Sequence, residues 1–533
     1  MKKACALVSA VVIAFSVAGA VPPAFAADAS ASVPQGLYTL EDEGAYNRFT
    51  NFVGGYSLLV DKDLRVDMRI AGVCATLEGP DKRISIFNQK LGGGVSASDY
   101  IAYSNGFLSN WTDHYLEYNG TQEIGGRNVH VTLWSRGRLS RIDNDKCYYA
   151  CLDIPAGDGE YVTVLVSSSA PLHRSGGYAY PAEGFRTVPK SAPPYIRRGG
   201  SVNAAFRGWN EETETFYEHY FGAESPLTWG IFEPHAPGNI EPLKEYEALV
   251  DYSFPILLNY SNFENVHKHP NLLQRLESAH KNGRTLELTL QTSAVQSPGE
   301  SNAVYAILNG AYDAFLTDYA ETVAAFGHPV LFRLGNEMNG DWCPYAGYNT
   351  SRDPRIFVEF YRYVYSFFER ADARNVIWIW NPNGKSFPNF TWNDALMYYP
   401  GDEYVDVVGL TAYNTGDYYP GETWKSFAEL YDNIYYSYVE KYEKPLMITE
   451  FASAVSGGDK NQWVLDMFAH IRYYDRIKVA VWWDGADYDS NGRIARNYFI
   501  DDPKILTETF RRSLRGAFDE RPADVLWKQD TFV

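Results

Sequence analysis

The chain contains 533 residues, of which 45% are hydrophobic, and it carries a formal net charge of -19 at pH 7. A chain of this length predicts two folded units with substantial cores. Nucleic acids and anionic membrane surfaces attract basic patches, and because the sequence shows none, neither is an expected partner. The 41 Tyr, 29 Phe and 13 Trp residues favour a neutral partner such as carbohydrate, although many of these rings are expected in the core.

The first 26 residues have the features of an export signal. Lys2 and Lys3 precede an apolar stretch over residues 6–21, and an A-x-A cleavage site occupies residues 24–26. Elsewhere no stretch approaches the ~20 apolar residues that a membrane-spanning helix needs. We therefore predict a signal peptide over residues 1–26 and a secreted, or otherwise extracytoplasmic, protein without a membrane span.

The next part of the chain is rich in short alternating runs, such as "NVHVTLWSR" and "EYVTVLVSSS", separated by Gly, Asp and Asn. The pattern predicts a smaller β-rich α+β domain over residues 36–186, with a mostly antiparallel sheet and one or two helices. It contains no catalytic signature, so its role stays open. Residues 187–203 are rich in Pro, Gly and charge, and are predicted to form a linker.

Four cysteines remain outside the predicted signal, too few for a disulfide framework in a chain of this size. Export permits one disulfide, with Cys74, Cys147 and Cys151 as the candidates. Cys147 and Cys151 are four residues apart, but no nearby Cys or His pair completes a zinc site. Residues 487–493 match the opening of a calcium loop, yet Tyr498 stands where the closing glutamate belongs. We predict no metal and no cofactor.

From residue 204 onward, short apolar runs alternate with amphipathic segments. The runs are nearly continuous, as is typical of buried parallel strands, and the segment after Pro354 places six aromatic or aliphatic residues on one helical face. Eight such strands with helical crossovers predict an α/β fold, a (β/α)8 TIM barrel, over residues 204–518. The eight runs are LTWGIFEP, FPILLNY, TLELTLQT, VLFRLGNE, VIWIWNP, VDVVGLTAYN, PLMITEF and VAVWWDG.

Polar residues end several of these runs. Active sites of such barrels lie at the carboxyl ends of the strands, where this sequence places Glu337, Asn381, Tyr413, Glu450 and Asp484. A lone polar residue there often only solvates the rim, but two glutamates end the fourth and seventh runs. Those strands lie across the barrel mouth from each other, so the two carboxyl groups can flank one glycosidic bond, as glycoside hydrolysis requires.

Three segments resemble glycoside hydrolase family 26, a family of barrel glycosidases with catalytic glutamates on strands four and seven. They are "FRLGNEMNGDW", "YYPGDEYVDVVGLTAYN" and "KPLMITEFA", and the likeness extends over about residues 228–487. The resemblance implies a retaining glycosidase. The best-known activity of the family is endo-β-1,4-mannanase, and mixed-linkage β-glucanases and β-1,3-xylanases also occur in it.

The resemblance implies a role for each matching residue. Glu450 would be the nucleophile that forms a glycosyl-enzyme, and Glu337 would protonate the departing oxygen and then activate water. Tyr413 would donate a hydrogen bond to the nucleophile, and Trp483 would form the floor of the cleavage subsite. Arg333 shares strand parity with Glu337, so it should point the same way and can orient a carboxylate.

Residues beside the fourth run are further candidates for substrate binding. Trp342 and Tyr345 follow the acid/base and are expected either to stack on sugars or to pack the loop. Trp482 should point to the opposite side of its strand from Trp483. The family usually has His before the acid/base, whereas this chain has Asn336, which in related families contacts the 2-hydroxyl of the sugar. That hydroxyl is axial in mannose and equatorial in glucose, so the change bears on specificity.

The leading hypothesis is a secreted retaining mannan endo-1,4-β-mannosidase with a polysaccharide substrate. One alternative keeps the mechanism but changes the substrate to a mixed-linkage β-glucan or an exopolysaccharide. An alternative from another class is a non-catalytic polysaccharide-binding protein, against which the intact glutamates argue. Endo or exo action and the oligomeric state remain open.

Overall fold

The computed structural model describes residues 34–172, 177–202, 207–263, 267–292 and 300–515. The predicted signal peptide therefore lies outside the described residues. The chain from Gln35 onward forms one compact unit that includes both the β-rich region and the barrel. The predicted domain and linker boundaries stay predictions, since within that unit the segment before residue 203 pairs with the barrel through Gly199 and Tyr442. No helix among the described residues is long and apolar enough to cross a membrane.

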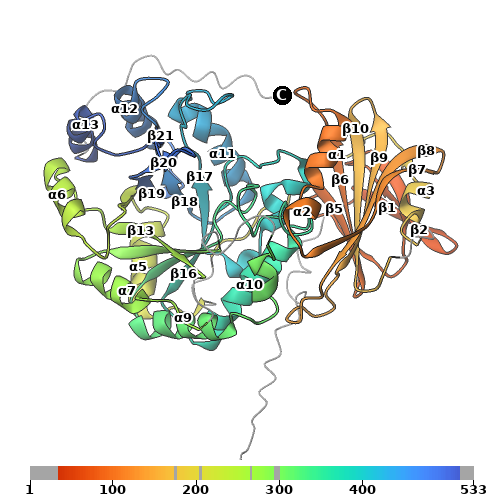
Figure 1. Cartoon of the computed structure of the whole chain (residues 1–533), viewed down its shortest axis with the longest axis horizontal. Helices are drawn as coiled ribbons and strands as arrows, with labels where there is room; N and C mark the ends of the chain where they lie inside the picture. The colour runs from red at the N-terminus through yellow and green to blue at the C-terminus, as the bar shows by residue number, and fades with distance from the viewer. Residues whose placement is uncertain (1–33, 173–176, 203–206, 264–266, 293–299, 516–533) are drawn as a thin grey trace, which may run out of the picture. The chain divides into compact units, whose positions relative to one another are not determined.

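The N-terminal region consists of two antiparallel sheets, as its alternating runs predict (Figure 1). The smaller sheet has the order β1-β2-β3-β11, and the larger has the order β4-β5-β6-β10-β9-β8-β7. Gly125 and Gly126 turn β7 into β8 with φ of 58° and 74°, the conformation that two-residue hairpins favour. The strands are β1 (Tyr38–Glu43), β2 (Tyr46–Asn51), β3 (Tyr56–Val60), β4 (Arg65–Asp67), β5 (Cys74–Glu78), β6 (Lys82–Lys90), β7 (His114–Ile124), β8 (Arg127–Arg136), β9 (Tyr148–Gly157), β10 (Glu160–Ser168) and β11 (Arg186–Thr187). The helices are α1 (Ala97–Ser104), α2 (Phe107–Asn110) and α3 (Tyr180–Glu183).

The disulfide that export would permit does not form among the described cysteines. Cys74, Cys147, Cys151 and Cys343 are all buried and free. Cys74 lies on β5 and Cys151 on β9, and β6 and β10 separate these two strands. Neighbouring strands are about 4.8 Å apart, so the two cysteines exceed the Cα separation of about 7 Å that a disulfide tolerates.

The second part of the chain is a closed barrel of eight parallel strands, which confirms the predicted fold. Each strand falls within one of the eight apolar runs or overlaps it, and β12 pairs with β19 to close the barrel. The strands are β12 (Thr228–Phe232), β13 (Ile256–Asn262), β14 (Thr285–Gln291), β15 (Val330–Leu334), β16 (Val376–Trp380), β17 (Val407–Thr411), β18 (Leu446–Phe451) and β19 (Ile477–Trp483).

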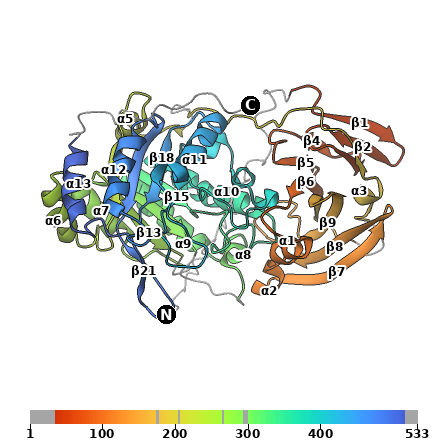
Figure 2. The same cartoon turned by 90° about the horizontal axis from the view of Figure 1, so that it is seen from above.

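Helices connect these strands and cover their outer side (Figures 1 and 2). In α10 the face predicted after Pro354 is buried, from Phe357 to Phe368. The helices are α5 (Glu211–Phe221), α6 (Glu241–Val250), α7 (Leu272–Lys281), α8 (Ala303–Ile307), α9 (Asp313–Phe326), α10 (Arg355–Arg370), α11 (Phe427–Lys441), α12 (Lys460–Ile471) and α13 (Ile505–Leu514). Short 3-10 turns, η2 (Thr391–Asn393), η3 (Ala395–Tyr398) and η4 (Asp402–Tyr404), and a hairpin of β20 (Ala486–Tyr488) and β21 (Ile494–Asn497) complete the fold.

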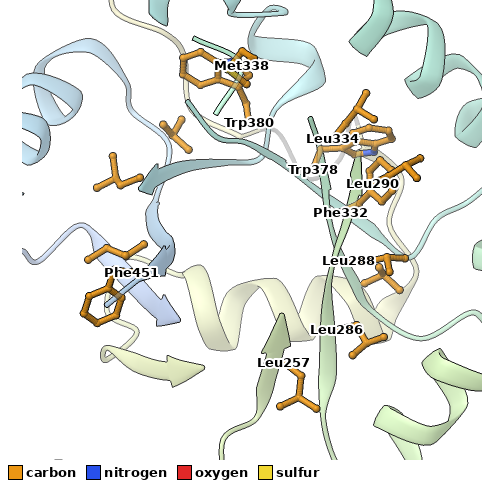
Figure 3. Packing of buried hydrophobic residues seen from close by; sticks show 14 of the residues in the cluster. Leu257, Leu286, Leu288, Leu290, Phe332, Leu334, Met338, Trp378, Trp380 and Phe451 are labelled. Carbon is orange, nitrogen blue, oxygen red and sulfur yellow. The ribbon is translucent and has the colours of Figure 1, made fainter. Parts of the chain in front are cut away.

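Two apolar cores hold the barrel in shape. The outer core lies between strands and helices, where side chains such as Leu288, Phe332 and Trp378 gather (Figure 3). The inner core fills the barrel with residues of the opposite parity, such as Leu331 and Ile377. Tyr217 and Phe221 of α5 join the inner core, so this helix closes the amino-terminal end of the barrel. The open end is the carboxyl end of the strands.

Candidate active site

Glu337 lies just beyond the end of β15 in a left-handed backbone conformation. Its φ is 54°, which is uncommon for any residue with a side chain and typical of functional sites. The conformation is fixed by the backbone N–H of Glu337, which donates to the Asn381 carbonyl at 2.8 Å. Asn383 Nδ2 donates to Glu337 Oε1 at 2.6 Å, and Trp342 Nε1 donates to Oε2 at 3.2 Å. Both carboxyl oxygens are therefore held in place.

The Glu337 carboxyl favours its protonated form more than an exposed glutamate does. Burial raises its pKa from 4.5 to about 7, and the negative charge of Glu450 adds to the rise. Hydrogen bonds from Asn383 and Trp342 act in the opposite direction without reversing it. A carboxylic acid that is substantially protonated near neutral pH can act as a general acid.

Glu450 lies on β18, across the barrel from β15, and is 4% exposed. Arg333 Nη2 donates to its Oε2 at 2.8 Å, so the expectation that Arg333 orients a carboxylate is confirmed. The Tyr260 hydroxyl, from β13, donates to the same oxygen. A cation and a hydroxyl therefore both donate to one oxygen of Glu450 and fix the orientation of its carboxyl group.

Tyr413 was expected to donate a hydrogen bond to the nucleophile; the described contact comes from Tyr260, and the role expected of Tyr413 stays a prediction. Tyr413 instead packs its ring against Trp483 and Tyr498, with centroids 6.3 and 5.2 Å away. Burial and the nearby charge of Glu450 raise its pKa, so the hydroxyl stays protonated beside the nucleophile. It therefore belongs to the site without holding the carboxylate directly.

Arg333 is fully buried and is the centre of a polar network inside the barrel. Its Nε donates to Thr289 Oγ1 and its Nη1 to Asn381 Oδ1, both at 2.8 Å. A third carboxyl group, that of Glu287 on β14, lies with Oε1 3.2 Å from Arg333 Nε. Burial raises the pKa of Glu287 to about 8. Near neutral pH the Glu287 carboxyl therefore favours its protonated form.

The aromatic candidates divide into two groups. Trp342 is 50% exposed, as a sugar platform requires, whereas Tyr345 is fully buried and is a loop-packing residue. Trp483 is half-buried, packs against both the inner and the outer core, and stacks on Phe232 with centroids 5.2 Å apart. Trp482 belongs to the outer core, which confirms the predicted alternation of the two tryptophans.

Asn336 lies between the strand and the acid/base and is 6% exposed. The Tyr345 hydroxyl donates to its backbone carbonyl at 2.7 Å and lies 3.3 Å from its Oδ1. The buried Tyr345 therefore fixes the position of Asn336 from behind. The proposed contact with the sugar stays a prediction.

Asp484 follows β19, and its Oδ1 accepts a hydrogen bond from the Ile500 backbone at 2.9 Å. Burial raises its pKa to about 7. This hydrogen bond connects the end of β19 to the segment before α13. Asp484, a predicted strand-end residue, therefore has a structural contact in the fold.

Residues with metal-binding side chains come together away from this site. Within the described ranges, Glu212, His280 and His328 have ligand atoms within 4.8 Å of one another. They lie beside a pocket lined by Thr285 and Pro329, at the amino-terminal ends of the strands.

In the predicted calcium-like segment, the Asp489 carboxylate accepts bonds from Asn491 and from Arg493 of its own hairpin.

Sequence reasoning missed Tyr260, Asn383 and Glu287. Tyr260 stands at the end of the second apolar run, and Asn383 two residues after Asn381, so both had the strand-end signal that selected other candidates. Glu287 is an acidic residue inside an apolar run, "TLELTLQT", which was also visible in the sequence.

The fold and site define a class: a closed (β/α)8 barrel whose mouth holds two carboxyl groups, one favouring its protonated form and one bound by an arginine and a tyrosine. Residues 282–478, which include both glutamates, match the family described as Glycosyl hydrolase family 26. The resemblance seen in the motifs is confirmed over this part of the barrel.

Parts of the chain are also similar to curated relatives. Endoglucanase H of Acetivibrio thermocellus is 34% identical over 210 residues, covering 39% of this chain and 22% of the relative. A mannan endo-1,4-beta-mannosidase of Bacillus subtilis is 36% identical over 97 residues, covering 17% of this chain and 25% of the relative. The chain thus spans about a quarter of these relatives' length. Among solved structures, a Cellulomonas fimi endo-beta-1,4-mannanase double mutant has 19% identity and a TM-score of 0.46, covering 61% of this chain and 79% of that one.

Proposed function

We propose that the protein is a secreted retaining glycoside hydrolase that cleaves a β-linked polysaccharide, with mannan as its first candidate substrate. The observation that carries the proposal is the unequal state of the two carboxyl groups. Burial and the charge of Glu450 raise the pKa of Glu337 to about 7, whereas Glu450 accepts hydrogen bonds from Arg333 and Tyr260. One acid and one nucleophile are what a retaining mechanism needs.

In the first step, Glu450 attacks the anomeric carbon while Glu337 donates its proton to the departing oxygen. Formation of the ester consumes the negative charge of Glu450, and this lowers the pKa of Glu337. In the second step, Glu337 is therefore able to accept a proton from water, which attacks the anomeric carbon and releases Glu450. Two displacements give net retention.

A β-glucan is the second candidate substrate, and two observations favour it. The chain has Asn336 where the family usually has His, at the position expected to meet the 2-hydroxyl that distinguishes glucose from mannose. In addition, the alignment with a relative named an endoglucanase covers 39% of the chain, more than the 17% aligned with a relative named a mannosidase.

Product formation from a polysaccharide panel tests the proposal. Purified protein is incubated with β-mannan, mixed-linkage β-glucan and β-1,3-xylan, and released reducing ends are counted, with Glu450→Ala as the control. We expect release from mannan or glucan, lost in the control, with the β-anomer formed first in a proton NMR time course. Binding without release from any member would favour a non-catalytic polysaccharide-binding protein, and an initial α-anomer would contradict retention.

A further inference from the structure

The N-terminal region contacts loops at the catalytic end of the barrel. Arg83 of β6 forms a buried ion pair, 2.6 Å long, with Asp353 in the loop that follows β15. Trp392, in the loop after β16, donates from Nε1 to Ser104 Oγ of α1 at 3.1 Å. Because these loops follow the carboxyl ends of the strands, the contacts place α1 beside the part of the mouth that carries Glu337.

The charged groups of this contact are buried. Arg352, in the same loop as Asp353, is 1% exposed and donates from Nη2 to the Tyr100 hydroxyl of α1 at 2.9 Å. Its guanidinium also lies 3.7 Å from Asp153 of β9. A buried arginine of this kind fixes the orientation of the groups around it, so α1 keeps one position relative to the loop.

Tyr103 stands in the last turn of α1, and its ring is 42% exposed. Its hydroxyl donates to Asp341, the residue immediately before Trp342. Tyr348 supports the ring from one side, with centroids 5.2 Å apart. A residue of the N-terminal region is thus fixed beside the loop of the general acid while part of its ring stays open to solvent.

Two barrel rings continue this exposed aromatic surface. Trp342 and Phe387 are 50% and 38% exposed, and their centroids are 5.3 Å apart. Trp342 Nε1 lies 3.2 Å from Glu337 Oε2, so the pair begins at the general acid. Scattered exposed rings need no explanation, but rings grouped around a catalytic carboxyl group indicate a binding surface.

We propose that Tyr103, together with Trp342 and Phe387, binds sugar units on the leaving-group side of the cleaved bond. The general acid touches the leaving oxygen, so rings that extend outward from Glu337 meet the part of the chain that departs. Flat amphipathic rings suit the apolar faces of a neutral β-linked polysaccharide. The inference rests on the proposed function and gives the N-terminal region a part in substrate binding.

The test combines binding and turnover. Affinity electrophoresis in gels containing β-mannan or mixed-linkage β-glucan measures binding by the inactive Glu450→Gln protein, with and without Tyr103→Ala. Tyr103→Phe keeps the ring and removes the bond to Asp341. Tyr115→Ala is the matched control, since Tyr115 is a 64% exposed tyrosine of β7 in the same region. The same substitutions in the active protein are compared by kcat/KM on the polysaccharide and on an aryl disaccharide.

We expect Tyr103→Ala to weaken binding and to lower kcat/KM on the polysaccharide by about threefold to tenfold, as loss of one stacked ring predicts. The loss should be smaller on the aryl disaccharide, whose leaving group is short. Tyr103→Phe, which keeps the ring but loses the bond to Asp341, should lose less than Tyr103→Ala, and Tyr115→Ala should behave like the parent. If the active protein cleaves polysaccharide and Tyr103→Ala equals Tyr115→Ala in both assays, the inference is wrong and the proposed function stands. If no polysaccharide is cleaved, the proposed function itself is wrong.

Discussion

Replacing Glu287 by Gln should stabilise the protein at neutral pH. Glu287 is fully buried, and neither of its carboxyl oxygens accepts a hydrogen bond from any described residue. Burial raises its pKa from 4.5 to about 8, while Arg333 opposes the rise and Glu450 adds to it. Native protein therefore retains a proton that the unfolded chain releases, and stability falls as pH increases from about 4.5 to about 8.

The magnitude follows from the size of the shift. Each pH unit between the unfolded and folded pKa values costs about 1.4 kcal/mol, so at pH 7 the retained proton costs about 3 kcal/mol. Gln has nearly the shape of the protonated acid and does not titrate. Glu287→Gln should thus gain about 3 kcal/mol at pH 7 and almost nothing at pH 4.5.

Urea unfolding at several pH values between 4.5 and 8 measures this gain. Glu247→Gln is the matched control, because Glu247 is also buried but is paired with Arg284 and accepts the Phe254 backbone N–H at 2.8 Å. That substitution should destabilise the protein throughout the range, since it leaves a buried arginine without its partner. If Glu287→Gln destabilises the protein at pH 7 as Glu247→Gln does, Glu287 is ionised in the native state and shares the charge of Arg333 with the nucleophile.

Further predictions concern the catalytic groups. Glu450→Ala should abolish turnover of every substrate, whereas Glu337→Ala should retain activity on substrates with an excellent leaving group and recover with azide; equal losses without rescue would contradict the assigned roles. The pKa of Glu337, about 7, sets the alkaline limb of kcat/KM, so the rate should fall as pH rises past that value, and a rate still climbing above pH 9 would exclude this acid. Tyr260→Phe should lower kcat more than Tyr413→Phe, because Tyr260 donates to the nucleophile, and the reverse order would show that Tyr413 is the residue that holds it during catalysis. Asn336→Ala should lower kcat and kcat/KM together, by an amount that corresponds to roughly 2–4 kcal/mol of lost transition-state stabilisation. A change in KM alone would show that Asn336 binds the ground state and the transition state equally.

Periodicity and parity determined what could be predicted from the sequence. Buried parallel strands produce apolar runs, so all eight barrel strands were found, and strand alternation correctly separated Trp482 from Trp483. A strand presents alternate residues to the same face, so the position of Arg333 on its strand predicted that it points into the barrel, where it contacts Glu450.

The errors arose where the chain leaves regular structure. Glu337 has a left-handed backbone, so the residues after it no longer follow the strand period, and Tyr345 turns inward while Trp342 stays exposed. Tyr260 and Tyr413 both stand at strand ends, and the contact with Glu450 depends on side-chain direction across the barrel. The contact of α1 with the acid/base loop joins residues more than 200 positions apart, which no local pattern in a single sequence reveals.

Trapping of the covalent intermediate tests the central claim most directly. A 2-deoxy-2-fluoro glycosyl fluoride of the sugar that the panel identifies slows both displacements, but its reactive leaving group allows the first to proceed, so the glycosyl-enzyme accumulates. Mass spectrometry of the intact protein and of its peptides then locates the adduct. The account predicts one glycosyl group on Glu450, absent from Glu450→Ala. An adduct on Glu337, or no adduct from an enzyme that turns over the parent polysaccharide, would contradict it.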